Sequence, residues 1–206
     1  MNSINLDRDP YSIIITGVGG QGNVMASRVM GSMFVTNGFS VTIGETFGAS
    51  QRGGSVMSHL RISKKSSWSP QIPRGGADMI VSLEPIEAVR VLAAYGNPGV
   101  ILLSNTRPIF PVNVIKGEAT YPAIEDIKTA VKNSISHAIF IDATEEALKM
   151  ENPILANIIM LGAVIGLNIL PLERDDFHKA IAERVPHDKI DVNMDAFDLG
   201  TRLVRQ

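Results

Sequence analysis

A glycine-rich turn near the N-terminus is the first stretch whose residues could hold a ligand. The sequence SIIITGVGGQGNVMASRVMG, residues 12–31, places Gly17, Gly19 and Gly22 in a G-x-G-x-x-G spacing after an apolar run. Glycines at this spacing allow a tight turn, and a helix that begins behind them offers free N–H groups to an anion. The pattern predicts a phosphate-binding turn like that of a dinucleotide-binding protein.

A second glycine-rich stretch, GETFGASQRGG, follows the next predicted strand. It opens at Glu45, where a dinucleotide-binding protein keeps the acid that binds ribose. Arg52 stands between Gln51 and the pair Gly53-Gly54, and a guanidinium beside such backbone can grip phosphate in two parallel hydrogen bonds. An ion pair across a subunit interface is its alternative role. We expect the two loops to face each other, as a surface for a polyanion or for another protein's active site.

A third candidate loop follows a later strand at Asn105-Thr106-Arg107. Arg107 could bind an anion there, or it could be a solvated turn residue. The candidate site residues are therefore Gly17, Gly19, Gly20, Gln21, Gly22, Glu45, Gln51, Arg52, Gly53, Gly54, Asn105, Thr106 and Arg107.

The rest of the chain offers few groups that could catalyse a reaction by themselves. The four histidines lack the spacing of metal ligands, and no G-x-S-x-G elbow surrounds a serine. Glu84 and Glu87 could form an acid–base pair, but carboxylates at the start of a helix complement its dipole, and we expect that role. We therefore predict no catalytic set and no metal site on this chain alone. It reads as a helper subunit.

The elements that must position these loops alternate between strands and helices. This alternation predicts an α/β fold: a single three-layer Rossmann-like domain with a mostly parallel sheet and a helical C-terminal part. The predicted strands span residues 13–16, 40–43, 55–63, 78–83, 99–104, 112–119 and 137–142, and the predicted helices span 20–37, 85–95, 123–133, 153–170, 173–184 and 187–204.

Composition narrows the function further. A chain of 206 residues suits one domain, and its formal net charge of −2 gives no basic footprint for nucleic acid. The chain has no cysteine, which excludes a disulfide framework, a cysteine nucleophile and a thiolate-bound iron–sulfur cluster on it. Its first residues lack the apolar stretch of a signal peptide, and we expect a cytoplasmic protein.

One apolar segment could be taken for a membrane span. Residues 153–172 carry no charge and contain Gly162-x-x-x-Gly166, a spacing found where membrane helices pack closely. About twenty apolar residues can cross a bilayer. Asn157 and Asn168 interrupt the segment, however, and its flanks carry no excess of Lys or Arg. We expect a buried helix whose glycines admit a close neighbour, and no membrane contact.

The chain resembles one known family through motifs that stand in that family's order and spacing: GVGGQG, ETFGASQRGGSVMSHLRI, ADMIVSLEPIEA, NTRPI, DAT and NPILANIIMLGAV. The family is the gamma-type domain of the 2-oxoacid:ferredoxin oxidoreductases, and the similarity is to the small (beta) subunit of indolepyruvate:ferredoxin oxidoreductases. It implies an N-terminal extension at 1–11, a pyruvate/ketoisovalerate oxidoreductase gamma-type domain at 12–185 and a C-terminal helix at 186–206. Phe47 departs from the family, which often has histidine there, and this leaves the aromatic substrate range open.

The resemblance implies a share in a reaction rather than a complete enzyme. In that reaction an arylpyruvate, coenzyme A and oxidised ferredoxin give an aryl-acetyl-CoA, carbon dioxide and reduced ferredoxin. A large (alpha) subunit would carry thiamine diphosphate, Mg²⁺ and [4Fe-4S] clusters, in a heterotetramer of two alpha and two beta chains. This chain would bind none of these cofactors alone, and its loops would border the place where coenzyme A reacts.

Two other classes of function stay open at this point. One is an NAD-binding Rossmann oxidoreductase, which would need a catalytic base and a substrate domain besides the glycine-rich turn. The other is a purely structural subunit whose loops only pack against a partner.

Overall fold

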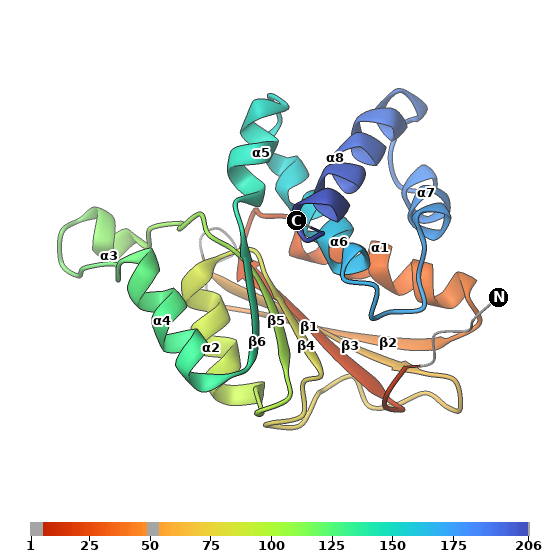
Figure 1. Ribbon diagram of the computed structural model, residues 1–206, viewed down its shortest axis with the longest axis horizontal. Helices are drawn as coiled ribbons and strands as arrows, with labels where there is room; N and C mark the ends of the chain where they lie inside the picture. Colours follow the sequence, from red (N-terminus) through yellow and green to blue (C-terminus); the bar gives the residue numbers. More distant parts are fainter. Residues whose placement is uncertain (1–5, 49–53, 206) are drawn as a thin grey trace.

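The computed structural model describes residues 6–48 and 54–205 and shows a six-stranded sheet between two layers of helices (Figure 1). The strand order is β2-β3-β1-β4-β5-β6. Strand β3 runs antiparallel to both of its neighbours, whereas the pairings β1–β4, β4–β5 and β5–β6 are parallel. The strands are β1 Tyr11–Val18, β2 Ser40–Phe47, β3 Ser55–Ser63, β4 Met79–Ser82, β5 Ile101–Asn105 and β6 His137–Ile141. The predicted α/β class with a mostly parallel sheet is confirmed.

Helices cover both faces of this sheet. Helices α2 and α4 lie on one face, and α1, α6, α7 and α8 lie on the other (Figure 1). The helices are α1 Asn23–Thr36, α2 Pro85–Tyr95, α3 Val112–Ile115, α4 Ile124–Ser134, α5 Ala143–Lys149, α6 Ala156–Gly166, α7 Arg174–Ala182 and α8 Ile190–Leu203, with 3-10 turns η1 Pro153–Leu155 and η2 His187–Lys189.

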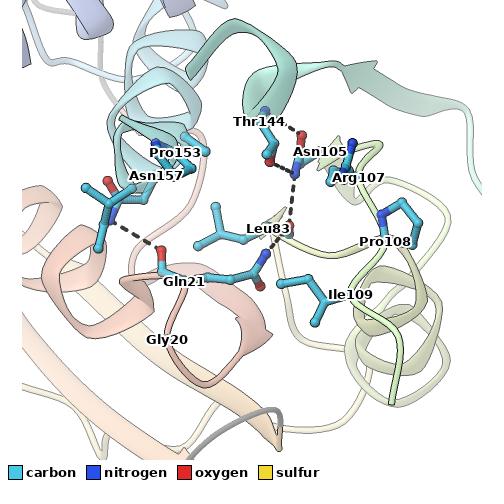
Figure 2. Close-up of a pocket in the computed structure, with 12 residues that line it drawn as sticks. Gly20, Gln21, Leu83, Asn105, Arg107, Pro108, Ile109, Thr144, Pro153 and Asn157 are labelled. Atoms are coloured by element: carbon cyan, nitrogen blue, oxygen red, sulfur yellow. Dashed lines mark hydrogen bonds between the residues drawn. The ribbon is translucent and has the colours of Figure 1, made fainter. Parts of the chain in front are cut away.

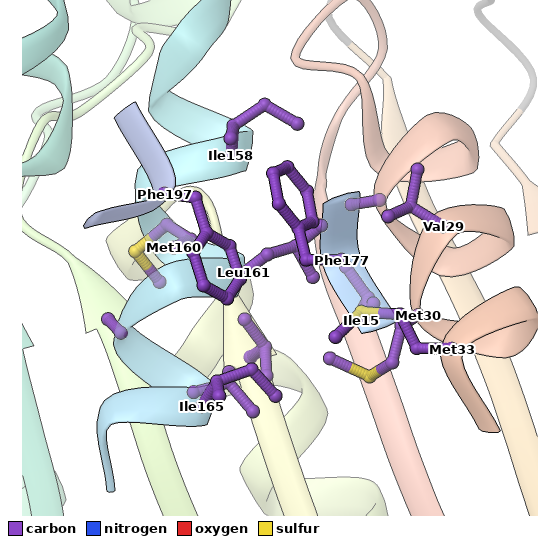
Figure 3. Packing of buried hydrophobic residues seen from close by; sticks show 14 of the residues in the cluster. Ile15, Val29, Met30, Met33, Ile158, Met160, Leu161, Ile165, Phe177 and Phe197 are labelled. Carbon is purple, nitrogen blue, oxygen red and sulfur yellow. The ribbon is translucent and has the colours of Figure 1, made fainter. Parts of the chain in front are cut away.

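The side chains of the central strand β1 contribute to two hydrophobic cores, one on each face of the sheet, because successive side chains of a strand point to opposite faces. Ile13 and Ile15 pack into the cluster beneath α1 and α6, and Ile14 packs into the cluster beneath α2 and α4. In the first cluster the rings of Phe177 and Phe197 stack with centroids 4.2 Å apart (Figure 3). Strand β1 is therefore buried on both sides, as the continuous apolar run in its sequence requires.

Helices α6 and α8 pack closely because glycines stand at their crossing. A Cβ atom on Gly162 would overlap the carbonyl oxygen of Phe197, and one on Gly200 would overlap that of Ile159. The glycine spacing thus serves contact between two helices of one domain. Within residues 6–48 and 54–205, no helix has both the length and the apolar character needed to cross a bilayer.

One predicted strand and the bounds of several predicted elements were wrong. Residues 112–119 form no strand: Pro111 precedes the short helix α3, and β5 already pairs directly with β6, which leaves no place between them. Strand β2 continues to Phe47 because it pairs with β3 along its whole length, so Glu45 lies inside a strand. The apolar segment from 153 begins as η1 and α6 ends at Gly166, so the predicted single helix to 170 is shorter and divided.

Candidate functional site

The candidate site lies at the carboxyl edge of the parallel strands, between β1 and β4. From β1 the chain passes through α1 to β2 and β3 on one side of the sheet, whereas from β4 it passes through α2 to β5 on the other. Open α/β sheets bind ligands at such a switch point, in the crevice beyond the strand ends. The glycine-rich turn after β1 and Leu83 after β4 border this crevice.

The turn after β1 has a backbone conformation that its glycines make possible. Gly20 and Gly22 have φ values of +103° and +83°, in the region that favours glycine. A Cβ atom on Gly22 would collide with the side chain of Asn157 from α6, whose Nδ2 lies 3.4 Å from the carbonyl oxygens of Gln21 and Gly22. Helix α1 therefore begins at Asn23 rather than at 20, and α6 supports the turn from behind.

The side chains of Gln21 and Asn105 form hydrogen bonds that join the ends of the strands. Gln21 Oε1 accepts from Val18 N at 2.9 Å, and its Nε2 donates to the carbonyl oxygen of Leu83 at 2.8 Å. Asn105 Nδ2 donates to the same oxygen at 3.1 Å and to Thr144 Oγ1 at 2.9 Å (Figure 2). These bonds join the ends of β1, β4 and β5 to the start of α5. The amide side chains are thus used within the chain.

Two cavities flank the turn. The first has a volume of about 470 Å³ and is lined by Gln21, Leu83 and Asn105 at the hydrogen-bonded strand ends (Figure 2). The second, of about 670 Å³, lies beside the first turn of α1 and is bordered by Phe47 and Val56. Gly20 and Ile154 line both. The N-terminus of α1 borders the second cavity with no side-chain cap and no acidic residue in its first turn. A helix end of this kind attracts an anion.

The third predicted loop contributes to the first cavity through Arg107. Its Nη1 forms an ion pair with Glu145 Oε1 at 2.5 Å, and about half of the guanidinium side chain stays exposed. Thr106 donates its hydroxyl to Asp142. The structure thus brings Arg107 and Asn105 together with the glycine-rich turn, while Thr106 faces the start of α5.

Glu45 does not reach the glycine-rich turn. Strand β3 separates β2 from β1, and the Glu45 carboxylate lies 3.6 Å from Arg28 Nε on α1. A dinucleotide-binding site needs its ribose-binding acid at the end of the strand next to the glycine-rich turn. The expectation that Glu45 opens the second loop was wrong, and its position argues against NAD binding.

The second glycine-rich loop falls partly outside the described residues. Gln51, Arg52 and Gly53 lie in the gap between 48 and 54. Gly54 is described, and its carbonyl oxygen accepts a hydrogen bond from Gly19 N at 2.9 Å. The end of the second loop therefore lies directly beside the first.

The buried carboxylate of Glu84 has two roles, and the sequence predicted only the first. Glu84 caps α2 as expected, with Oε2 accepting from Glu87 N at 3.0 Å. Its Oε1 also accepts from Tyr121 at 2.5 Å and from Ile109 N at 3.3 Å. Burial, and then the bond to Glu84, raises the pKa of Tyr121, so the phenol stays protonated as a donor. Tyr121 lies 37 residues from Glu84, and local sequence patterns carry no signal for such a contact.

The fold is that of a Rossmann-like α/β domain with its candidate site at the carboxyl edge of the sheet. Residues 12–203 match the family described as pyruvate ferredoxin/flavodoxin oxidoreductase, and the chain belongs to that family. This confirms the resemblance seen in the sequence motifs.

One relative is similar in sequence, and two solved structures are similar in fold, over most of this chain. Indolepyruvate oxidoreductase subunit IorB of Pyrococcus horikoshii is 38% identical over 197 residues, which cover 95% of this chain and 96% of the relative. The gamma subunit of a keto/oxoacid ferredoxin oxidoreductase from Geobacter sulfurreducens has the same fold, with a TM-score of 0.68, 21% identity and coverage of 95% and 98%. A 2-oxoglutarate:ferredoxin oxidoreductase from Magnetococcus marinus gives a TM-score of 0.73 at 17% identity, and the matched part covers 97% of this chain but 32% of that longer chain.

Proposed function

We propose that this chain is the small subunit of an oxidoreductase that oxidatively decarboxylates an arylpyruvate, with indolepyruvate as its principal substrate. The products are the aryl-acetyl-CoA and carbon dioxide, and the electrons released pass to ferredoxin. The observation that carries the proposal is the 38% identity, over nearly the full length of both chains, with a subunit named for indolepyruvate oxidation.

The cofactors of the reaction belong to the larger subunit in this proposal. Thiamine diphosphate with Mg²⁺ and [4Fe-4S] clusters would supply decarboxylation and electron transfer there. The absence of cysteine from this chain supports that division, because such clusters need thiolate ligands. The assembly would be a cytoplasmic heterotetramer of two large and two small subunits, with ferredoxin as its electron acceptor.

The carboxyl edge of the sheet would form one wall of the place where coenzyme A reacts. The two cavities have volumes in the range of small-molecule sites, and the uncapped N-terminus of α1 borders the larger one. A phosphate of coenzyme A would accept hydrogen bonds from that helix end and from the guanidinium of Arg52. This chain would thus orient the co-substrate and exclude water.

A purely structural subunit is the second candidate function. It is favoured by the finding that Gln21 and Asn105 use their amide groups within the chain. In that case changes in the loops would weaken assembly without changing the use of coenzyme A. Kinetics of the intact complex therefore separate the two candidates.

The proposed function is tested on the native complex. We would co-purify this chain with its larger subunit and assay indolepyruvate, phenylpyruvate and pyruvate with coenzyme A, using ferredoxin or NAD⁺ as the acceptor. The expected result is the highest kcat/KM for indolepyruvate, with electrons passing to ferredoxin and none to NAD⁺. A preference for pyruvate would refute the arylpyruvate assignment, and NAD⁺ reduction would revive the dinucleotide alternative.

A further inference from the structure

Exposed apolar side chains gather at one edge of the molecule. Among the described residues, nine large hydrophobic side chains are exposed, and seven of them lie at or beyond the carboxyl edge of the sheet. The other two, Val35 and Trp68, lie toward the opposite edge. The seven are Phe47, Ile109, Phe110, Val112, Ile115, Leu148 and Ile154. Such a bias toward one edge marks an interaction surface.

Four of these side chains come from one short stretch of sequence, residues 109–115, and together they are called the 109–115 rim: Ile109, Phe110, Val112 and Ile115. The exposed fractions of Val112 and Ile115 are 66% and 72%. Helix α3, which carries both, buries none of its residues against the rest of the chain, and it projects from the body of the molecule (Figure 1). The chain therefore gains little for its own core from Val112 and Ile115.

The rim is held in place from beneath. The fully buried carboxylate of Glu84 accepts hydrogen bonds from Ile109 N and from Tyr121, one on each side of α3. The ring of Phe110 meets the ring of Tyr121 edge-on, with centroids 5.4 Å apart. Ile109 and Tyr121, which precede and follow α3 in the chain, are thus tied to the N-terminus of α2. A surface ordered in advance loses less conformational entropy when it binds.

We propose that the 109–115 rim is the seat of the larger oxidoreductase subunit. The identity of this occupant rests on the proposed function. Ile109 lines the first cavity, so a chain that covers the rim also covers one side of that cavity. The occupant must bring catalytic groups to this edge, because the sequence contains no self-contained catalytic set. A second copy of this chain would bring none.

The test compares charge substitutions on the rim with a matched control. Val112→Asp and Ile115→Asp each place a carboxylate in the rim, and Val35→Asp makes the same change at a side chain that is 58% exposed near the opposite edge. Thermal unfolding first establishes that all three variants fold like the wild-type chain. Sedimentation velocity then gives the Kd of each for the larger subunit, purified from the native complex.

We expect each rim variant to raise that Kd by about ten- to a hundredfold, as for residues at the centre of an interface, and Val35→Asp to leave it unchanged. Wild-type affinity in both rim variants would overturn the rim assignment while leaving the proposed function standing. An equal loss in all three variants, or an effect on self-association of the chain alone, would also overturn it. Failure of the wild-type chain to bind the larger subunit would overturn the rim and the proposed function together.

Discussion

At the scale of single residues, some polar side chains at the carboxyl edge stabilise the fold and others could bind a ligand. Gln21 and Asn105 meet on one carbonyl oxygen, that of Leu83. Both amides would leave buried polar groups unpaired if removed, so their loss would act on stability before it acted on a ligand. Arg107, whose side chain is about half exposed at this edge, is a better candidate for binding a co-substrate.

Arg52 is the residue whose substitution tests the coenzyme A wall. A charged hydrogen bond contributes roughly 1.5–3 kcal/mol, so Arg52→Ala should raise the apparent KM for coenzyme A by about ten- to a hundredfold. Arg52→Lys should recover only part of the loss, because an ammonium keeps the charge without the planar fork. The measurement is steady-state kinetics of the intact complex, with exposed Arg202 on α8 changed to alanine as the control. An unchanged KM in a complex that falls apart would make Arg52 an interface residue.

His59 gives the chain a stability that depends on pH. Burial first, and the charge of Arg61 second, lower the pKa of this imidazole, whose Nδ1 accepts from Ile72 N. In the unfolded chain the imidazole has its ordinary pKa of about 6.5, so on acidification it binds a proton at a higher pH than in the folded chain. The stabilisation is therefore complete above about pH 6.5 and is lost as the pH falls from there toward the lower folded value.

The expected result is that the free energy of unfolding falls as the pH is lowered through about 6.5 in the wild-type chain and falls less in His59→Gln. Glutamine keeps an acceptor for Ile72 N but does not titrate. Urea unfolding at a series of pH values measures the difference. His178→Gln, at an exposed position of α7, is the matched control. The same slope in His59→Gln would show that another group causes the dependence.

At the scale of elements, the contact between α6 and α8 depends on the absence of side chains at its closest point. Alanine in place of a helical glycine normally stabilises a helix by up to about 1 kcal/mol. In Gly200→Ala the new methyl group would meet the carbonyl oxygen of Ile159, so we expect a loss of about 1–3 kcal/mol instead. Denaturant unfolding measures it, with Asp195→Ala on the exposed side of α8 as the control. A stabilised Gly200→Ala variant would mean that the helices separate easily.

At the scale of the whole molecule, the proposed function assigns one wall of an active site to this chain and the reacting groups to its larger partner. We expect the isolated chain to show no visible absorption, to contain no iron and to oxidise no 2-oxoacid when thiamine diphosphate, Mg²⁺ and coenzyme A are supplied. Activity should return when the larger subunit is added. The measurements are an absorption spectrum, an iron determination and a ferredoxin-linked assay. An iron–sulfur spectrum from the pure chain would contradict the assignment of the clusters to the larger subunit.

The assembly itself can be measured at the same scale. We expect a stable hetero-oligomer with two copies of each subunit when the chain is co-expressed with the larger subunit. The exposed 109–115 rim provides an apolar surface for it, and the relatives named as subunits support it. Sedimentation equilibrium gives the stoichiometry. Separate monomers at micromolar concentration would be the contrary result.

Much of this structure is determined by local sequence. The apolar run before Gly17 specifies a buried strand, and the glycines after it specify a turn that ends where α1 begins. Glu84 before a proline specifies the start of α2, and the spacing of Gly162 and Gly166 specifies a close helix neighbour. These features could be predicted because backbone conformation, capping and periodicity act over a few residues.

Other features were decided only by the tertiary structure. The insertion of β3 between β1 and β2 removes Glu45 from the glycine-rich turn, although the sequence alone places it where a ribose-binding acid would stand. The meeting of Gln21 with Asn105 and the meeting of Glu84 with Tyr121 join segments far apart in the chain. The order of strands and the partners of buried polar groups depend on which edges pair and which faces pack. Those are choices among long-range contacts, and a local pattern does not encode them.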